Sequence, residues 1–311
     1  MAAEELDVIE AAETAADTID YGDIANLRRA RWRQTADLKV KTQAEAVRFI
    51  EEVGVALLFP GDGIALPDLW SAINGRERDI PKRHHDWALH KTWDWKDRIP
   101  SRRLAWYGKL VRGKPAFVAL TDLPAVYAMS SNFGELDDYL EAYNDGLLSR
   151  EGKEIYEALL ERGALPTSEL RKVTGMAGGG DNARRFERAI VELQQDFKIV
   201  KAGISDANRW KYCYVYDVLL RWAPDVADKA RAYTSRTATR HLVGRYLDSS
   251  VAARPGVFAK MFGWEPAVTQ RYIEEMIAEG TLVPVRVLGA PAATPKGKTA
   301  PDGEVWVVKG R

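Results

Sequence analysis

The sequence of 311 residues balances 45 Lys and Arg side chains against 45 Asp and Glu side chains, and 46% of its residues are hydrophobic. This apolar fraction excludes an intrinsically disordered chain, and the length is typical of two or three domains. The zero net charge excludes a protein that holds nucleic acid through bulk positive charge alone, although local basic patches are still compatible with DNA binding.

Cys213 is the only cysteine, which excludes an intramolecular disulfide and a cysteine-based zinc site. The N-terminus has no basic stretch followed by an apolar run, and no run approaches 18 apolar residues, so neither a secretory signal nor a membrane span is expected. A reducing, cytoplasmic location is the prediction that follows.

Residues 1–41 are expected to form an N-terminal extension that is first acidic and then basic. Residues 1–20 contain seven acidic side chains and no basic one, whereas residues 28–41 contain six basic side chains. We expect a solvated segment, and the alternative is an arm that touches an acidic polymer through its basic half.

Residues 42–148 predict a first winged-helix unit with an insertion. Thr42 and Glu45 match a capping box, in which hydroxyl and carboxylate satisfy free backbone N–H groups, and Gly54 is placed to end that helix. Three helices followed by a hairpin is the order of a winged helix. The remaining elements of this unit are expected at residues 67–74, 84–98, 106–111 and 115–120, with the hairpin loop at 112–114.

The same order is expected twice more along the chain. Residues 149–216 give the clearest signal, because Phe186, Ala189, Ile190 and Leu193 recur at helical spacing before two strands at 197–201 and 210–216. In residues 217–311, helices near 242–246, 257–263 and 268–280 precede strands at 282–287 and 305–308, with a long wing loop at 289–303. The predicted fold class is therefore mainly α with small β-hairpins, built from three tandem winged-helix units.

A helix-turn-helix followed by a wing places one helix in a major groove and a loop on the backbone. In the second unit, the third helix and the strand after it carry basic residues suited to phosphate contacts, which give salt-dependent affinity and little sequence choice. These residues are Arg184, Arg185, Arg188, Lys198 and Lys201. The alternative is that this unit contacts another protein.

Charge is more polarised in the first unit. Residues 76–114 contain twelve basic and five acidic side chains, and tryptophans are interleaved with them. Bases stack on aromatic rings while phosphates meet cations, so this stretch suits nucleic acid, unless its tryptophans belong to the core. The predicted DNA contacts are Arg102, Arg103, Lys109, Arg112 and Lys114, and the base-stacking candidates are Trp93, Trp95 and Trp106.

Three segments of the chain resemble the AlkZ/YcaQ family of winged-helix DNA glycosylases, which unhook crosslinks and remove alkylated purines. They are residues 47–55 (VRFIEEVGV), 93–97 (WDWKD) and 106–110 (WYGKL). The resemblance covers roughly residues 42–288 and implies damaged duplex DNA as the partner, with no cofactor. It identifies the chain as a divergent member of that family.

The family's catalytic motif, Gln-x-Gln or Gln-x-Asp, follows the first helix, but residues 54–63 contain no glutamine. The nearest polar group is Asp62, which is the candidate to hold the attacking water, although its surroundings also suit an ordinary turn. The alternatives are a DNA-binding regulator or damage-binding protein that lost the activity, and a protein-interaction scaffold. A metal site is not expected, because His84, His85 and His90 lack the spacing of helical ligands.

Overall fold

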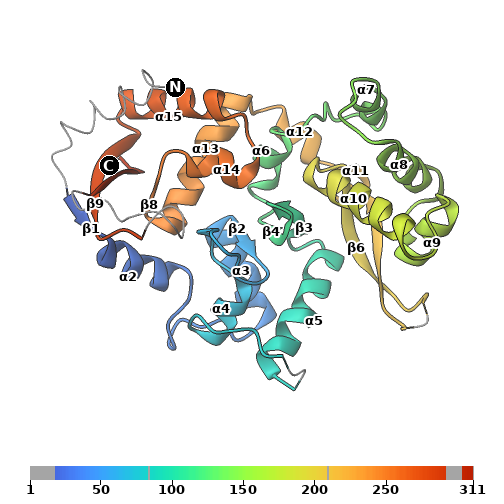
Figure 1. The fold of residues 1–311 in the computed structure, drawn as a ribbon, viewed down its shortest axis with the longest axis horizontal. Coiled ribbons are helices and arrows are strands. Elements are labelled where there is room, and N and C mark those ends of the chain that lie inside the picture. The colour runs from blue at the N-terminus through green and yellow to red at the C-terminus, as the bar shows by residue number, and fades with distance from the viewer. Residues whose placement is uncertain (1–17, 83–84, 209, 292–302, 311) are drawn as a thin grey trace.

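The computed structural model describes residues 18–82, 85–208, 210–291 and 303–310. In this part of the chain, helices make up most of the regular structure and the strands form three small sheets (Figure 1). The predicted class, mainly α with small β-hairpins, is confirmed.

The first predicted helix begins after its cap residue Thr42, as the sequence predicts. The Thr42 side chain accepts a hydrogen bond from the Glu45 N–H at 3.2 Å, while the Glu45 carboxylate accepts one from the Lys41 N–H at 2.8 Å. Gly54, at φ 77°, ends the first helix. The first unit consists of α3 (Gln43–Val53), β2 (Val55–Leu57), α4 (Leu69–Asn74), α5 (Trp87–Ser101), β3 (Trp106–Val111) and β4 (Lys114–Val118). Its short strand β2 pairs with β4, which the sequence analysis did not predict.

The two other units repeat this order. The second consists of α8 (Arg150–Arg162), β5 (Leu165–Pro166), α9 (Thr167–Val173), α10 (Asp181–Gln195), β6 (Ile199–Ser205) and β7 (Cys213–Val218). The third consists of α13 (Ser235–Ser250), β8 (Ala252–Ala253), α14 (Val257–Phe262), α15 (Pro266–Ala278), β9 (Leu282–Leu288) and β10 (Glu304–Lys309). In each sheet the last strand lies between the short strand and the first hairpin strand, in the orders β2-β4-β3, β5-β7-β6 and β8-β10-β9. Most of the predicted third wing loop, residues 292–302, lies outside the described residues.

The N-terminal segment is not a solvated extension where it is described. Strand β1 (Thr18–Asp20) pairs in parallel with β9, and helix α2 (Tyr21–Arg31) packs against α13. The Arg28 guanidinium donates to the carbonyls of Ser250 and Ala252, both at 2.6 Å. A cation at the carboxyl end of α13 complements the helix dipole, so the basic half of this segment stabilises the third unit. Residues 1–17 lie outside the described residues.

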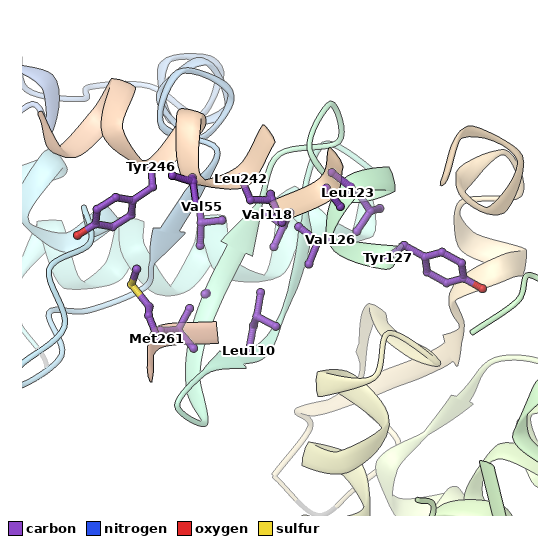
Figure 2. Close-up of a cluster of buried hydrophobic side chains, with 14 of the residues drawn as sticks. Val55, Leu110, Val118, Leu123, Val126, Tyr127, Leu242, Tyr246 and Met261 are labelled. Atoms are coloured by element: carbon purple, nitrogen blue, oxygen red, sulfur yellow. The ribbon is translucent and has the colours of Figure 1, made fainter. Parts of the chain in front are cut away.

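Four short helices connect the units, and three of them share one hydrophobic core with the units, whereas the helix at Asp138–Asn144 belongs to the cluster of the second unit. The four are α6 (Leu123–Tyr127), α7 (Asp138–Asn144), α11 (Leu219–Trp222) and α12 (Val226–Ala230). Helix α6 packs on α12 and α13. Figure 2 shows the shared cluster, in which Val55 and Leu110 of the first unit meet Tyr246 and Met261 of the third. Because apolar surface from several units is buried together, this core fixes how the units are arranged around the β3–β4 hairpin.

Candidate nucleic-acid interface

Asp62, the candidate catalytic residue, lies on an exposed turn after β2. The stretch directly after the first helix, where the glycosylases of the resembling family carry their motif, contains Ala56, Leu57 and Leu58. These three side chains are 0%, 0% and 2% exposed. No side chain in this stretch carries a polar group, and its apolar side chains are packed in the core. These three positions therefore offer no polar side chain that could hold a water molecule.

Helix α10 has the predicted amphipathic character, with Phe186, Ala189, Ile190 and Leu193 buried. Its three arginines differ in their surroundings. Arg185 is held by Glu151 at 2.6 Å, whereas the exposed Arg184 has only a local pair with Asp181 at 3.3 Å. Arg188 is exposed and lines a hollow described below. Exposed pairs of this kind contribute only a few tenths of a kcal/mol, so Arg184 and Arg188 are available to phosphates.

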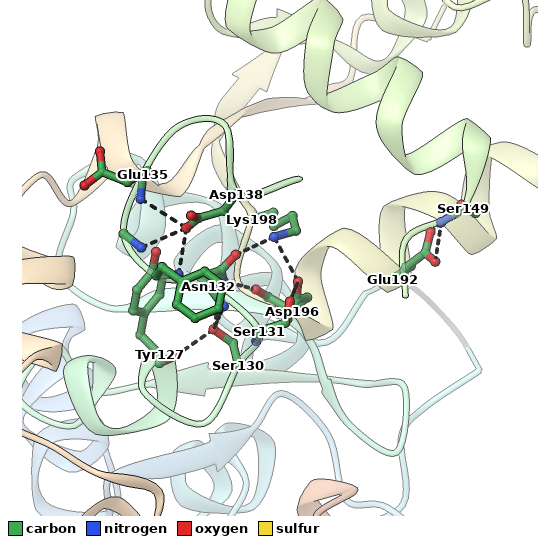
Figure 3. Close-up of polar contacts among 12 residues, drawn as sticks. Tyr127, Ser130, Ser131, Asn132, Glu135, Asp138, Ser149, Glu192, Asp196 and Lys198 are labelled. Atoms are coloured by element: carbon green, nitrogen blue, oxygen red, sulfur yellow. Dashed lines mark hydrogen bonds and ion pairs between the residues drawn. The ribbon is translucent and has the colours of Figure 1, made fainter. Parts of the chain in front are cut away.

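Lys198 and Lys201 do not present their ammonium groups to solvent, which corrects their placement among exposed DNA contacts. Lys198 is 3% exposed and binds Asn132 and Asp196, the latter at 3.1 Å (Figure 3). Lys201 is 7% exposed, and its ammonium lies 3.7 Å from the ring centre of Tyr214. For Lys201 the physical reason is that β6 packs against α5 of the first unit, which covers the side of the strand that an isolated wing would expose.

The predicted contacts of the first unit lie on or near its hairpin. Arg112 and Lys114 are exposed at the turn between β3 and β4, and Lys109 lies on β3, 3.6 Å from the carboxylate of Glu187 on α10. Arg102 and Arg103 are exposed after α5 and line neither of the two large pockets. The hairpin therefore brings Lys109 toward α10, whereas Arg112 at its tip lies beside the third unit.

The three base-stacking candidates separate into one exposed and two buried tryptophans. Trp93 is 45% exposed and packs against Phe59, with ring centres 5.5 Å apart. Trp95 and Trp106 lie in hydrophobic clusters, and Trp106 packs against Phe197 at 4.7 Å. As placed, these two rings belong to the core, as the alternative interpretation held, because the covering elements come from distant parts of the chain.

A hollow of about 740 Å³ lies where the three units meet, and we call it the central hollow. Lys109 comes from the first unit, Arg188 from the second, and Phe262 and Trp264 from the third. The rings of Phe262 and Trp264 are stacked, 4.8 Å apart. The sequence analysis missed Trp264, although an aromatic residue directly after the helix-ending Gly263 was a visible signal. Acidic side chains also line the hollow, so its charge is mixed.

We call four cations on α10 and on the β3–β4 hairpin the basic row. It consists of Arg184, Arg188, Lys109 and Arg112. All three acidic residues in the central hollow already have partners, since Glu187 pairs with Lys109, Glu192 binds Ser149, and Asp196 binds Ser131 and Lys198. Cations of the row are spread over two units, so one rigid ligand that follows the row would contact both.

Three further observations concern the described residues. No three His, Cys, Asp or Glu side chains within them converge as metal ligands, and His84 lies outside them. Among the helices that the structure describes, none is long and apolar enough to cross a membrane. Cys213 is a buried free thiol.

Comparisons with known proteins agree with this architecture. The profile of a family described as AlkZ related matches residues 40–263. Among solved structures, the chain is similar to Streptomyces sahachiroi DNA glycosylase AlkZ at 10% sequence identity and a TM-score of 0.51, over 94% of this chain and 70% of that one. At this identity the similarity concerns the fold. A search of curated proteins found no match.

Proposed function

The chain belongs to the AlkZ-related family, and from this membership we propose that it binds damaged duplex DNA without excising bases. In this proposal residues 42–148, 149–216 and 217–311 are three winged-helix units. The repeated order of helix, short strand, two helices and hairpin supports this assignment, as does the common strand order in the three sheets.

The basic row supports DNA as the partner. Exposed arginines on the third helix of one unit, followed by cations on the hairpin of another, suit successive phosphates of a backbone. Arg185, Lys198 and Lys201 are engaged within the protein and make no such contact in the proposal. The expected binding is therefore salt-dependent and modest in sequence preference.

The proposal that the protein does not excise bases rests on the burial of β2. Hydrolysis of a glycosidic bond needs a carboxylate or amide that holds water beside the sugar. Ala56, Leu57 and Leu58 occupy the stretch after the first helix, and all three are buried. The rings of Phe262 and Trp264 in the central hollow are the surface that we propose to recognise an unstacked or damaged base.

Excision through Asp62 is the second candidate, and one observation favours it. Asp62 is exposed and directly precedes Gly63, which lines a pocket together with Arg112 and Lys260. A carboxylate beside cations that hold DNA is a plausible place for the attacking water.

Incubation with duplexes that contain N7-methylated or crosslinked bases tests the absence of excision. We expect no released base from wild-type protein or from Asp62→Asn, when the products are analysed by mass spectrometry. Base release that Asp62→Asn abolishes would establish the second candidate instead. Release that Asp62→Asn leaves intact would contradict both, because another group would then hold the water.

Fluorescence anisotropy with the same duplexes at several salt concentrations tests DNA binding. We expect tighter binding to damaged than to undamaged duplex. The double variant Arg184→Ala, Arg188→Ala should weaken binding and lower the slope of log affinity against log salt by about 2, since each phosphate contact contributes about 0.9. The matched control is Lys229→Ala with Arg231→Ala, which removes two exposed cations at α12. An unchanged slope would refute the basic row and favour a protein-interaction scaffold.

A further inference from the structure

A second pocket, of about 570 Å³, lies between the first and third units, and we call it the seam pocket. The first unit contributes Ile64 and the hairpin-tip residue Arg112, and the third contributes Lys260 and Met261. The Tyr246 hydroxyl donates to the Ala65 carbonyl at 2.8 Å and ties the two sides together. The volume falls in the range of small-molecule sites, roughly 300–1,000 Å³.

The charge of the seam pocket is entirely positive. Its described lining contains Arg28, Arg112, Arg254 and Lys260 and no acidic residue. Arg28 donates to carbonyls of the third unit, and Arg254 is paired with Glu304 at 2.5 Å. Arg112 and Lys260 are exposed, and neither has a hydrogen bond or ion pair with any described residue. Two free cations at one pocket favour an anionic ligand.

The other walls of the seam pocket are aromatic and apolar. Tyr21 and Trp306 pack edge to face, with ring centres 6.0 Å apart. The Arg254 guanidinium lies 4.7 Å from the centre of the Trp306 ring, which fixes this wall. Ile64 and Met261 complete an apolar surface next to it. Trp306 is 3% exposed, with the guanidinium groups of Arg254 and Arg28 beside its ring, so the half-buried Tyr21 and Ile64 are the part of this wall that a ligand can reach. This part suits a planar ring, and the preferred ligand therefore combines an aromatic ring with a negative charge.

Arg112 has an unusual backbone conformation for its side chain. The two-residue turn between β3 and β4 has φ 50° at Arg112 and φ 72° at Gly113, as in a type I′ turn. Asn-Gly and Asp-Gly are the favoured pairs there, and a residue with a long side chain at positive φ costs roughly 1–3 kcal/mol. The turn itself does not require an arginine at this position. The backbone strain at Arg112, on the rim of the pocket, therefore points to a role for its side chain in binding.

We propose that the seam pocket binds a nucleotide, with the phosphate between Arg112 and Lys260 and the base against the half-buried side chains of Tyr21 and Ile64. The ligand chemistry is a phosphate joined to a planar base, which a free mononucleotide and a nucleotide within a single strand share. Arg112 belongs both to the basic row and to the seam pocket, whereas Arg184 and Arg188 lie outside the pocket. Lys260 belongs to the pocket alone, so the inference goes beyond duplex binding and Lys260→Gln tests it separately.

Isothermal titration of the full chain with dAMP, deoxyadenosine and a single-stranded trinucleotide tests the proposal. We expect dAMP to bind and deoxyadenosine to bind at least tenfold more weakly, since it lacks the phosphate. Arg112→Asn and Lys260→Gln should each lower dAMP affinity about tenfold. Lys172→Gln, which removes an exposed cation at α9, is the matched control and should leave it unchanged.

Arg112→Asn also separates binding from folding. Because Asn is favoured at this turn position, the variant should be as stable as wild type or more stable, while its affinity falls. Binding of the trinucleotide alone, weakened tenfold by both variants, would support a nucleotide within a strand as the ligand. Failure of both ligands to bind, or binding that neither variant changes, would overturn the proposal and leave duplex binding untouched.

Discussion

Lys201 carries the strongest prediction about stability, because its ammonium group is buried at the seam between the first and second units. Burial lowers its pKa from the ordinary 10.5 to about 7, and repulsion by Lys96 and Lys109 adds to the effect. The ring faces of Tyr214 and Tyr107, 3.7 Å and 4.6 Å from the ammonium, favour the charged form in part. We therefore expect Lys201→Met to stabilise the protein at neutral pH.

The magnitude follows from the difference between folded and unfolded pKa values. Between pH 7 and 10.5 the unfolded chain holds a proton on Lys201 that the folded chain has released, so the free energy of unfolding rises with pH. One pKa unit corresponds to about 1.4 kcal/mol, and the whole window therefore to about 5 kcal/mol. From pH 6.5 to 9, the expected rise for wild type is about 2.5 kcal/mol.

Urea denaturation of wild type and Lys201→Met at pH 6.5, 7.5, 8.25 and 9 measures this rise. Burial raises the pKa of Tyr107 in the folded state, so ionisation of tyrosines in the unfolded chain, near pH 10, would lower the stability. The pH series therefore stops at pH 9, below that range. The stability advantage of Lys201→Met should be largest at pH 6.5 and shrink by about 2.5 kcal/mol at pH 9. The same advantage at both pH values would refute a neutral Lys201 in the folded protein.

Three other variants test local features by urea denaturation. Gly54→Ala should destabilise by about 1–3 kcal/mol, since Gly54 has φ 77° and an added Cβ would lie 2.8 Å from the Asp122 carboxylate. Arg28→Ala should destabilise by about 2–3 kcal/mol, because two buried carbonyls lose their charged donor. Burial raises the pKa of Asp68 from 3.8 to about 6, so stability falls as pH rises from 4 to 6. Asp68→Asn keeps the cap on Ser71, removes that fall, and should stabilise by up to about 3 kcal/mol at pH 7.

A specific experimental result would contradict each of these expectations. Wild-type stability of Gly54→Ala would show that the turn relaxes without cost. Wild-type stability of Arg28→Ala would mean that water replaces the guanidinium, and a less stable Asp68→Asn at pH 7 would mean that the carboxylate is favourable where it lies.

Local signals predicted the helices well. Thr42 and Gly54 bound the first helix as expected, and the spacing of Phe186, Ala189 and Leu193 identified the buried face of α10. These features depend on neighbours within about one turn of the chain, which the sequence displays directly. The short strands β2, β5 and β8 escaped prediction, because two or three residues carry no period and pair only with distant strands.

The candidate site was harder to predict, because docking between units decides which side chains are exposed. Lys201 occupies a position that would face solvent in an isolated wing strand, yet α5 of another unit covers it. Trp106 lies on a hairpin strand and is fully buried for the same reason. Conversely, Lys260 and Trp264 carry no motif, and their importance appears only when the third unit is placed against the first.

The pairing of β1 with β9 has a consequence for how the protein folds during synthesis. Arg28 and its acceptor carbonyl on Ser250 are separated by 222 residues. At the usual elongation rate of about 5–20 residues per second, the opening segment leaves the ribosome roughly 10–45 s before its partner exists. The nascent chain therefore carries β1 and the arginine-rich α2 without their partners until the third unit has emerged, and docking of this N-terminal segment onto the third unit is expected to be a late step of folding.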